Sequence, residues 1–98
     1  MVMLMSKYLY YRDENCTVSI QPVNDVVHLH CIVVEWKLST LKKLYTIFSQ
    51  LQKDMSYYGF KYLATITPNP RFAKLFGGES IKEEEIDGVL HEVIVWEL

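Results

Sequence analysis

One long amphipathic segment constrains this sequence more than any other feature. Apolar residues recur at intervals of three and four over about five helical turns: Leu41, Leu44, Tyr45, Phe48, Leu51, Met55 and Tyr58. This spacing places them on one stripe of an α-helix, while lysine and glutamine occupy the opposite side. Ser39 or Thr40 can cap the start, and Gly59 suits the left-handed residue that ends a helix. The pattern predicts a helix with one buried face.

Strand-forming runs flank this helix on both sides. In residues 26–36 both faces of the predicted strand are apolar, apart from His28, His30 and Glu35, and this pattern favours a central strand. Residues 61–67 form a β-rich run after the helix. A strand–helix–strand unit of this kind predicts two parallel strands with a right-handed crossover.

Two hairpins are expected at the ends of the chain. Residues 4–12 and 16–21 alternate in the manner of paired strands around the turn residues Asp13, Glu14 and Asn15. Residues 71–76 predict a short helix that Gly77 and Gly78 stop. Residues 79–86 and 89–98 then form a hairpin across Asp87-Gly88, the strongest hairpin signal in the chain.

The elements therefore follow the order β-β-β-α-β-α-β-β, in an α/β (α+β) fold with a mixed sheet of about six strands. We expect residues 1–98 to form one domain, with an N-terminal hairpin region at residues 1–25.

Composition excludes several classes of function. The formal net charge is −2, and no basic stripe is present, which argues against nucleic-acid binding. The apolar start at residues 1–5 is too short for a signal core or a membrane span. Cys16 and Cys31 lack metal-ligand spacing, so we interpret them as reduced thiols of a cytoplasmic protein with no metal site.

Two segments resemble the GCN5-related N-acetyltransferase (GNAT) family. "HLHCIVVEWKLSTLKKLYTIF" stands where that family has its central strand, its phosphate-binding turn and its long helix. "YGFKYLATITPNPRFAKLFGG" stands where it has the next strand and a short helix. Trp36, Leu38 and Ser39, with Arg71, Phe72 and Lys74, are most similar to GNAT-like proteins of tailed bacteriophages, including a small internal virion protein. The resemblance covers residues 26–98 and implies the C-terminal half of the fold.

The resemblance also implies a catalytic apparatus that this sequence largely lacks. Family members bind the pyrophosphate of acetyl-CoA on a glycine-containing turn before the long helix. Here that turn has no glycine, and Trp36, Lys37, Ser39 and Thr40 are the candidate cofactor-binding residues. The family's acid is commonly a tyrosine on the short helix, where this chain has Ala73.

Two functions from different classes remain open. The sequence favours a non-catalytic phage protein that acts through contacts with a host or virion protein, as a virion component or an inhibitor of a host system. Tyr8, Tyr10 and Tyr11 are then the candidate contact residues, homodimer formation is a further expectation, and no cofactor is needed. The alternative is a minimal acetyl-CoA-dependent N-acetyltransferase that modifies a host amine, with Glu35 or His30 as general base. A stand-alone αβ module of unrelated ancestry is a third reading.

Overall fold

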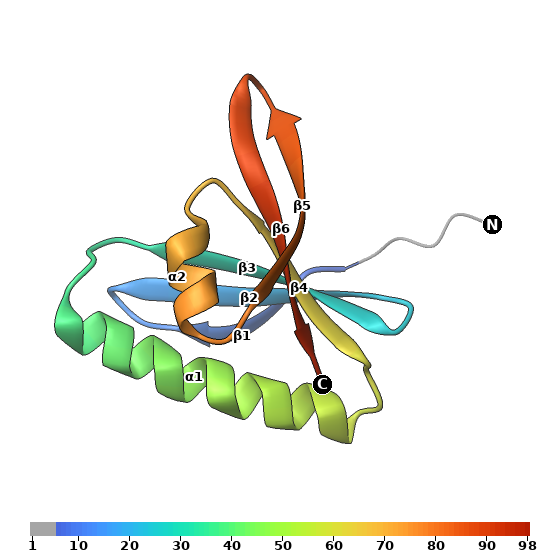
Figure 1. The fold of residues 1–98 in the computed structure, drawn as a ribbon. Coiled ribbons are helices and arrows are strands. Elements are labelled where there is room, and N and C mark those ends of the chain that lie inside the picture. The colour runs from blue at the N-terminus through green and yellow to red at the C-terminus, as the bar shows by residue number, and fades with distance from the viewer. Residues whose placement is uncertain (1–5) are drawn as a thin grey trace.

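The computed structural model describes residues 6–98, which form a six-stranded mixed sheet with both helices on one of its faces (Figure 1). The strands are β1 (Tyr8–Arg12), β2 (Cys16–Val23), β3 (Val26–Val33), β4 (Tyr62–Thr67), β5 (Glu79–Ile86) and β6 (Val89–Glu97). The helices are α1 (Leu38–Tyr57) and α2 (Pro70–Leu75). Their order and the predicted fold class are confirmed.

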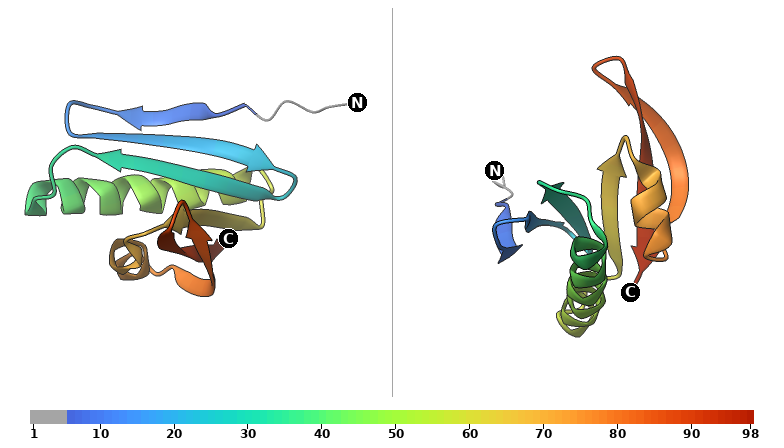
Figure 2. Two further views of the ribbon diagram at one scale, coloured as in Figure 1. Left: turned by 90° about the horizontal axis from the view of Figure 1, so that it is seen from above. Right: turned by 90° about the vertical axis from the view of Figure 1, so that its left-hand side faces the viewer.

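The sheet runs in the order β1-β2-β3-β4-β6-β5 (Figure 2). β3 and β4 are parallel, as the strand–helix–strand pattern predicts, and every other neighbouring pair is antiparallel. The turn between β5 and β6 has Asp87 and Gly88 at φ values of 52° and 77°, the left-handed conformation that a type I′ hairpin needs.

The long helix begins earlier than the sequence predicts. Lys37 is its N-cap residue, and its side chain makes no capping hydrogen bond. Ser39 and Thr40 lie inside the first turn, so the expectation that one of them caps the helix is wrong. β3 ends at Val33, and residues 34–36 connect it to a helix that begins at Leu38.

The apolar stripe of α1 is narrower than predicted. Leu44, Phe48, Leu51 and Met55 are buried as expected, together with Ile47. Tyr45 and Tyr58 belong to the predicted stripe but are 60% and 71% exposed. Tyr45 lies about 100° around the helix from Leu44, at the rim of the buried line. Tyr58 is the C-cap residue, beyond the last helical residue Tyr57.

Both helices end in a Schellman motif. Gly59 has φ +89°, and the N–H of Phe60 donates to the carbonyl oxygen of Met55 at 3.1 Å. At the end of α2, Gly77 also has φ +89°, and the N–H of Gly78 donates to the carbonyl oxygen of Ala73 at 3.1 Å. The helix-ending role predicted for the glycines is confirmed at both places.

The strand at residues 26–36 is shorter than predicted and ends at Val33. Val33 lies opposite Cys16, the first residue of β2, so β3 has no partner strand beyond that point. β3 is central in the sheet, but only one of its faces is covered, and Ile32 on the other face is 67% exposed. Residues 4 and 5 of the predicted first strand lie outside the described residues.

The core lies between one face of the sheet and the two helices. Val18, Val27, Leu63 and Ile94 extend from the sheet into it, and none of them is more than 1% exposed. Phe48 of α1 contacts both Phe72 and Phe76 of α2, with ring centroids 5.8 Å and 5.1 Å apart. These contacts fix α2 beside α1, while the tip of the β5–β6 hairpin projects beyond both helices (Figure 1).

Candidate functional site

The two central strands separate after a short parallel contact. β3 and β4 pair at only three positions, which are Val26 with Tyr62, Val27 with Leu63, and His28 with Ala64. Beyond them β3 stays paired with β2, and β4 stays paired with β6. A cavity of about 440 Å³ opens in the wedge between the diverging strands.

Aromatic rings form much of the cavity wall. Trp36, which follows β3, stands edge-to-face on Phe72 of α2, with ring centroids 4.5 Å apart. Phe48 and Trp96 also line the cavity and lie 6.5 Å apart. The polar part of the wall comes from Thr65, Thr67, Asn69, His30 and Lys7. The cavity therefore suits a ligand with an apolar body and a few polar groups.

Unpaired backbone groups of β3 face this cavity. The N–H of Val34 donates to the carbonyl oxygen of Asn15, on the β2 side, at 2.8 Å. The backbone N–H and C=O groups of successive residues in a strand point alternately to its two neighbours. The even-numbered residues of β3 therefore turn their backbone groups toward β2, and the odd-numbered ones toward β4. Cys31 and Val33 thus present N–H and C=O groups where β4 has moved away, and an extended ligand could pair with them.

One side chain bridges the gap between the separating strands. The hydroxyl of Thr65 donates to the carbonyl oxygen of Leu29 at 3.0 Å. This bond occupies the first backbone acceptor beyond the last β3–β4 pair. It therefore sets how far toward the paired end of the strands a ligand can reach.

Among residues 6–98, His30 is the one imidazole that lines the cavity. Its Nε2 lies 3.2 Å from Oε1 of Gln21. Burial, and then the neighbouring Lys7 and His28, lower the pKa of His30, so the ring is neutral at pH 7. In the tautomer whose Nε2–H donates to Gln21, Nδ1 keeps a lone pair that can accept a proton.

The cavity wall contains no tyrosine within the described residues. Cys31 lines it, but burial raises the pKa of this thiol to about 12, so it stays protonated and is a weak nucleophile. The α2 residue nearest to the expected acid position is Ala73, which is buried. The described cavity wall thus has a candidate base but no tyrosine in the acid role that the family resemblance implies.

The candidate cofactor residues lie at the start of α1 but do not converge on the cavity. Trp36 lines it, whereas Lys37 forms an exposed ion pair with Glu35 at 3.9 Å. Ser39 is exposed, and Thr40 is 1% exposed with an Oγ1 that has no hydrogen-bond partner. Glu35 is outside the cavity wall, so His30 is the candidate base that the structure brings to the site.

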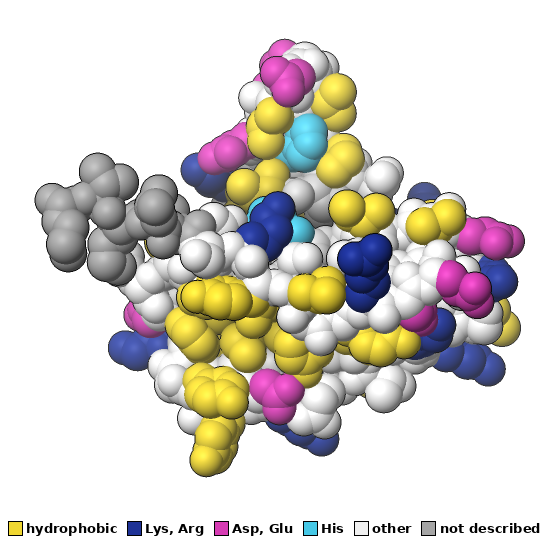
Figure 3. Space-filling view, turned by 180° about the vertical axis from the view of Figure 1, so that it is seen from behind, with side chains coloured by type: hydrophobic (Ala, Val, Ile, Leu, Met, Phe, Trp, Pro, Cys, Tyr) yellow, Lys and Arg dark blue, Asp and Glu magenta, His cyan; other side chains and the backbone are white. Residues whose placement is uncertain are grey.

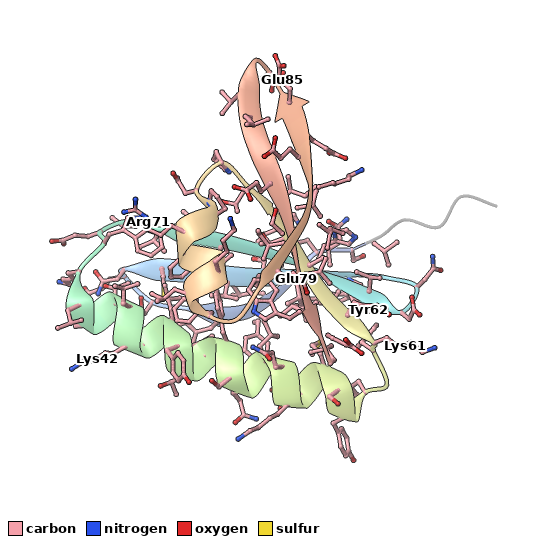
Figure 4. All side chains as sticks on the ribbon, viewed as in Figure 1. Lys42, Lys61, Tyr62, Arg71, Glu79 and Glu85 are labelled. Carbon is pink, nitrogen blue, oxygen red and sulfur yellow. The ribbon has the colours of Figure 1, made fainter. Side chains whose placement is uncertain are left out.

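Basic side chains surround the start of α1. Figure 4 shows Arg71 of α2 and Lys42 of α1 at the end of the molecule where α1 begins. The first N–H groups of a helix have no partner in the helix, and no side chain caps them here. An anionic group could therefore be held at this end, beside the aromatic cavity.

The three candidate contact tyrosines have different surroundings. Tyr8 is 57% exposed. The hydroxyl of Tyr10 donates to Oδ2 of Asp54 at 2.6 Å, and that of Tyr11 donates to Oδ2 of Asp13 at 2.8 Å. Tyr10 and Tyr11 are half-buried and pack against the core. Tyr8 is therefore the most accessible of the three.

Several site residues have no recognisable signal in the sequence. Thr65, Asn69 and Trp96 come from three different segments, and only the divergence of β3 and β4 brings them together. Thr65 is a polar residue between the apolar Ala64 and Ile66, but this pattern does not reveal its contact with Leu29.

Two further features of the described residues limit the kinds of site. No group of three or more His, Cys, Asp and Glu side chains in residues 6–98 is arranged to hold a metal ion. Neither described helix combines the length and apolar character needed to cross a membrane. The cavity between β3 and β4 is thus the main candidate site.

Comparison with known proteins gives structural matches but no sequence matches. No protein-family model matches the chain, and no curated protein does so significantly. The structure is similar to ribosomal-protein-S5-alanine acetyltransferase from Vibrio fischeri, with a TM-score of 0.64 and 12% identity. It is also similar to a protein described as a GnaT-family acetyltransferase from Bordetella pertussis, with a TM-score of 0.62 and 10% identity.

These matches cover most of this chain but about half of the others. They include 85% and 83% of this chain, and 54% and 56% of the Vibrio and Bordetella proteins. A domain from Methanocaldococcus jannaschii also matches, with a TM-score of 0.56, 13% identity, and coverage of 88% of this chain and 69% of that one. At such low identity the likeness concerns the fold. The chain therefore has a GNAT-like acetyltransferase fold.

Proposed function

We propose that this protein is a non-catalytic protein of GNAT-like fold that acts through contacts with another protein. The observation that carries the proposal is the cavity wall, whose described residues include no tyrosine to protonate a departing thiolate. Acetyl transfer from a thioester needs such a proton, or a solvent molecule in its place, when the C–S bond breaks. The buried Ala73 stands near the position from which the family's tyrosine acts.

The turn before α1 also supports a role without acetyl-CoA. Trp36 packs on Phe72 at 4.5 Å, and Glu35 and Lys37 pair with each other. A diphosphate bound to the helix start would lie near the carboxylate of Glu35, which repels it. No glycine in this turn lets the backbone approach the phosphates closely.

The proposed partner is a host or virion protein. This choice of partner rests on the resemblance of residues 26–98 to GNAT-like proteins of tailed bacteriophages. The resemblance favours a virion component or an inhibitor of a host system. Tyr8 is the accessible aromatic of the edge strand β1, and tyrosine is enriched in protein interfaces. It is therefore the first contact residue to test.

A specific observation favours the second candidate, a minimal N-acetyltransferase. The wedge between β3 and β4 offers unpaired backbone groups, an aromatic wall, and a neutral His30. Such a wedge could hold the amide-containing arm of acetyl-CoA, and His30 could accept a proton from an attacking amine. Glu35 is the other candidate base, but it lies outside the cavity wall.

Thermal unfolding with acetyl-CoA separates the two candidates. A ligand that binds only the folded state must raise the melting temperature in a saturable way. We expect no saturable rise with acetyl-CoA or CoA, and no release of free thiol above the protein-free rate when amines are added. A saturable rise that Trp36→Ala abolishes, with thiol release that His30→Ala abolishes, would instead establish the acetyltransferase. Tyr57→Ala is the matched control, since Tyr57 is 86% exposed and lies outside the cavity.

The contact itself is tested by affinity purification with the tagged chain. The expected result is a protein that the unmodified chain retains, that Tyr8→Ala loses, and that Tyr57→Ala keeps. Retention by Tyr8→Ala at the unmodified level would place the contact elsewhere.

A further inference from the structure

Backbone groups face the wedge between β3 and β4 from both of its walls. On β3 they belong to Cys31 and Val33, which lie beyond the last residue paired with β4. On β4 the odd-numbered residues turn toward β6, because the N–H of Leu98 donates to the carbonyl oxygen of Lys61 at 2.9 Å. The N–H and C=O of Ile66 therefore turn toward β3. Beyond the short β3–β4 ladder, neither wall has a strand to pair with in the wedge.

The spacing of these groups matches that of a peptide main chain. Along one side of a strand, an N–H and a C=O recur at every second residue, about 6.6 Å apart. An extended peptide repeats its own groups at the same interval, so it can be added to a sheet as a further strand. A segment of about three residues is long enough to pair with both Cys31 and Val33.

The wedge has an apolar pocket on its helix side. Successive side chains of a strand point to opposite faces of the sheet. Leu29 is 4% exposed and points toward the helices, so Cys31 and Val33 point the same way. Phe48 of α1 and Trp96 of β6 line the cavity on this side. A side chain of the bound segment that points toward the helices should therefore be apolar.

The opposite side of the wedge carries a positive charge. His30 and Ile32 point away from the helices, and Ile32 is 67% exposed. Lys7 lines the cavity beside His30 and is the one charged side chain in its wall within residues 6–98. Figure 3 shows this side of the molecule, where a histidine lies against a basic side chain near the middle of the view. An acidic residue of the bound segment would meet a cation here and no carboxylate.

We propose that the wedge binds an extended segment of a partner protein, added as a strand beside β3. Two apolar side chains of the segment point toward the helices, and an acidic side chain between them points toward Lys7. Main-chain pairing supplies affinity in this mode of binding, and the alternating side chains supply selectivity. The inference rests on the proposed function, in which the partner is a protein, and it names the part of that partner which is recognised.

Titration of the full chain with a short peptide tests the proposal. The probe is the pentapeptide Ala-Leu-Glu-Leu-Ala, with an acetyl group and an amide at its ends. Trp36 and Trp96 are the two tryptophans of the sequence, and both line the cavity. The fluorescence of the chain should therefore change in a saturable way as the peptide fills the wedge.

Hydrogen exchange locates the peptide on β3. The amides of Cys31 and Val33 should exchange about tenfold more slowly when the peptide is at about ten times its dissociation constant. The amides of His30 and Ile32 already face β2, so their exchange should not change. This alternation along one strand distinguishes main-chain pairing from general stabilisation of the fold.

Matched controls separate the two parts of the recognition. The same peptide, methylated at its three central amide nitrogens, keeps its side chains but cannot donate to β3, so it should bind at least about tenfold more weakly. A peptide with lysine in place of glutamate should bind about threefold more weakly, and Lys7→Glu should reverse this preference. Lys53→Glu, on the exposed side of α1, should leave both affinities unchanged.

Other outcomes overturn the proposal. The wedge is not a strand-binding site if neither fluorescence nor exchange changes at up to about 5 mM peptide, a range that detects a dissociation constant of about 1 mM. Equal binding of the methylated peptide removes the main-chain pairing, and an unchanged preference in Lys7→Glu removes the acidic residue. If the peptide fails but a captured partner still depends on Tyr8, the proposed function stands without the wedge. Thiol release from acetyl-CoA would instead remove the proposed function.

Discussion

The hydroxyl of Thr65 donates a 3.0 Å hydrogen bond to the carbonyl oxygen of Leu29, across the point where β3 and β4 separate. Leu29 is 4% exposed, and its carbonyl faces the side from which β4 has departed. The bond replaces a ladder hydrogen bond that the diverging backbones no longer make. It marks the closed end of the cavity.

Thr65→Val should lower the free energy of unfolding by about 1–2 kcal/mol, because the isosteric side chain leaves the Leu29 carbonyl without its partner. Urea denaturation measures this change. Thr65→Ser keeps the hydroxyl and should retain more of the stability. Equal stability of the valine variant and the unmodified chain would mean that water serves the carbonyl equally well.

Tyr10→Phe should destabilise the protein by about 1 kcal/mol, because the hydroxyl of Tyr10 joins the edge strand β1 to Asp54 on α1. Burial, and then the Asp54 carboxylate, raise the pKa of Tyr10, so the hydroxyl remains a donor throughout the usual pH range. Tyr8→Phe is the control, since Tyr8 is exposed. A urea midpoint that falls as much in Tyr8→Phe as in Tyr10→Phe would contradict the assignment.

Stability should fall in acid through the Asp13 cluster. A hydrogen bond from Lys43, and then those from the Asn15 backbone and Tyr11, lower the pKa of Asp13 below its ordinary value of 3.8. The folded-state pKa is thus below the unfolded one. The resulting stabilisation is complete above about pH 4, and it is lost as the pH falls toward the folded-state value.

Melting temperatures across the acid range measure this effect. Asp13→Asn should flatten the dependence below about pH 4, because the amide cannot take up the proton. Glu14→Gln removes an exposed neighbouring carboxylate and serves as the control. If the two variants follow the same curve, Asp13 does not carry the acid sensitivity.

Gly78→Ala should destabilise the protein by roughly 1–3 kcal/mol through overpacking. A Cβ at this position would collide with Cγ2 of Ile94 and would lie 3.0 Å from the carbonyl oxygen of Ala73. Gly77→Ala is the matched comparison, because its Cβ meets open space and only its φ of +89° opposes the change, at about 1 kcal/mol. The melting temperature of Gly78→Ala should therefore be lower than that of Gly77→Ala.

Local patterns predicted most of the fold. The spacing of Leu44, Phe48 and Leu51 identified α1, and Asp87-Gly88 identified the last hairpin, because both signals depend on residues close in sequence. The helix start was misplaced because the polar Ser39 resembles a cap. The length of β3 was overestimated because its last partner is Cys16, where β2 begins.

The candidate site was less predictable. His30 and Trp36 were identified from the sequence and do line the cavity. Thr65 and Trp96 were not, because their positions depend on strand divergence, which is a long-range property. The exposure of Ile32 also could not be foreseen, since an apolar strand residue gives no sign of whether a second layer covers it.

The three-residue contact between β3 and β4 divides the sheet into two plates. One plate contains β1, β2 and β3, and the other contains β4, β6 and β5. Within the plates β2–β3, β4–β6 and β5–β6 pair at eight, six and seven positions, and β1–β2 at four. A change in the angle between the plates therefore disturbs few backbone hydrogen bonds. The short seam contributes few backbone hydrogen bonds, so the two plates are joined chiefly by the core that Val27, Leu63 and α1 share beneath them.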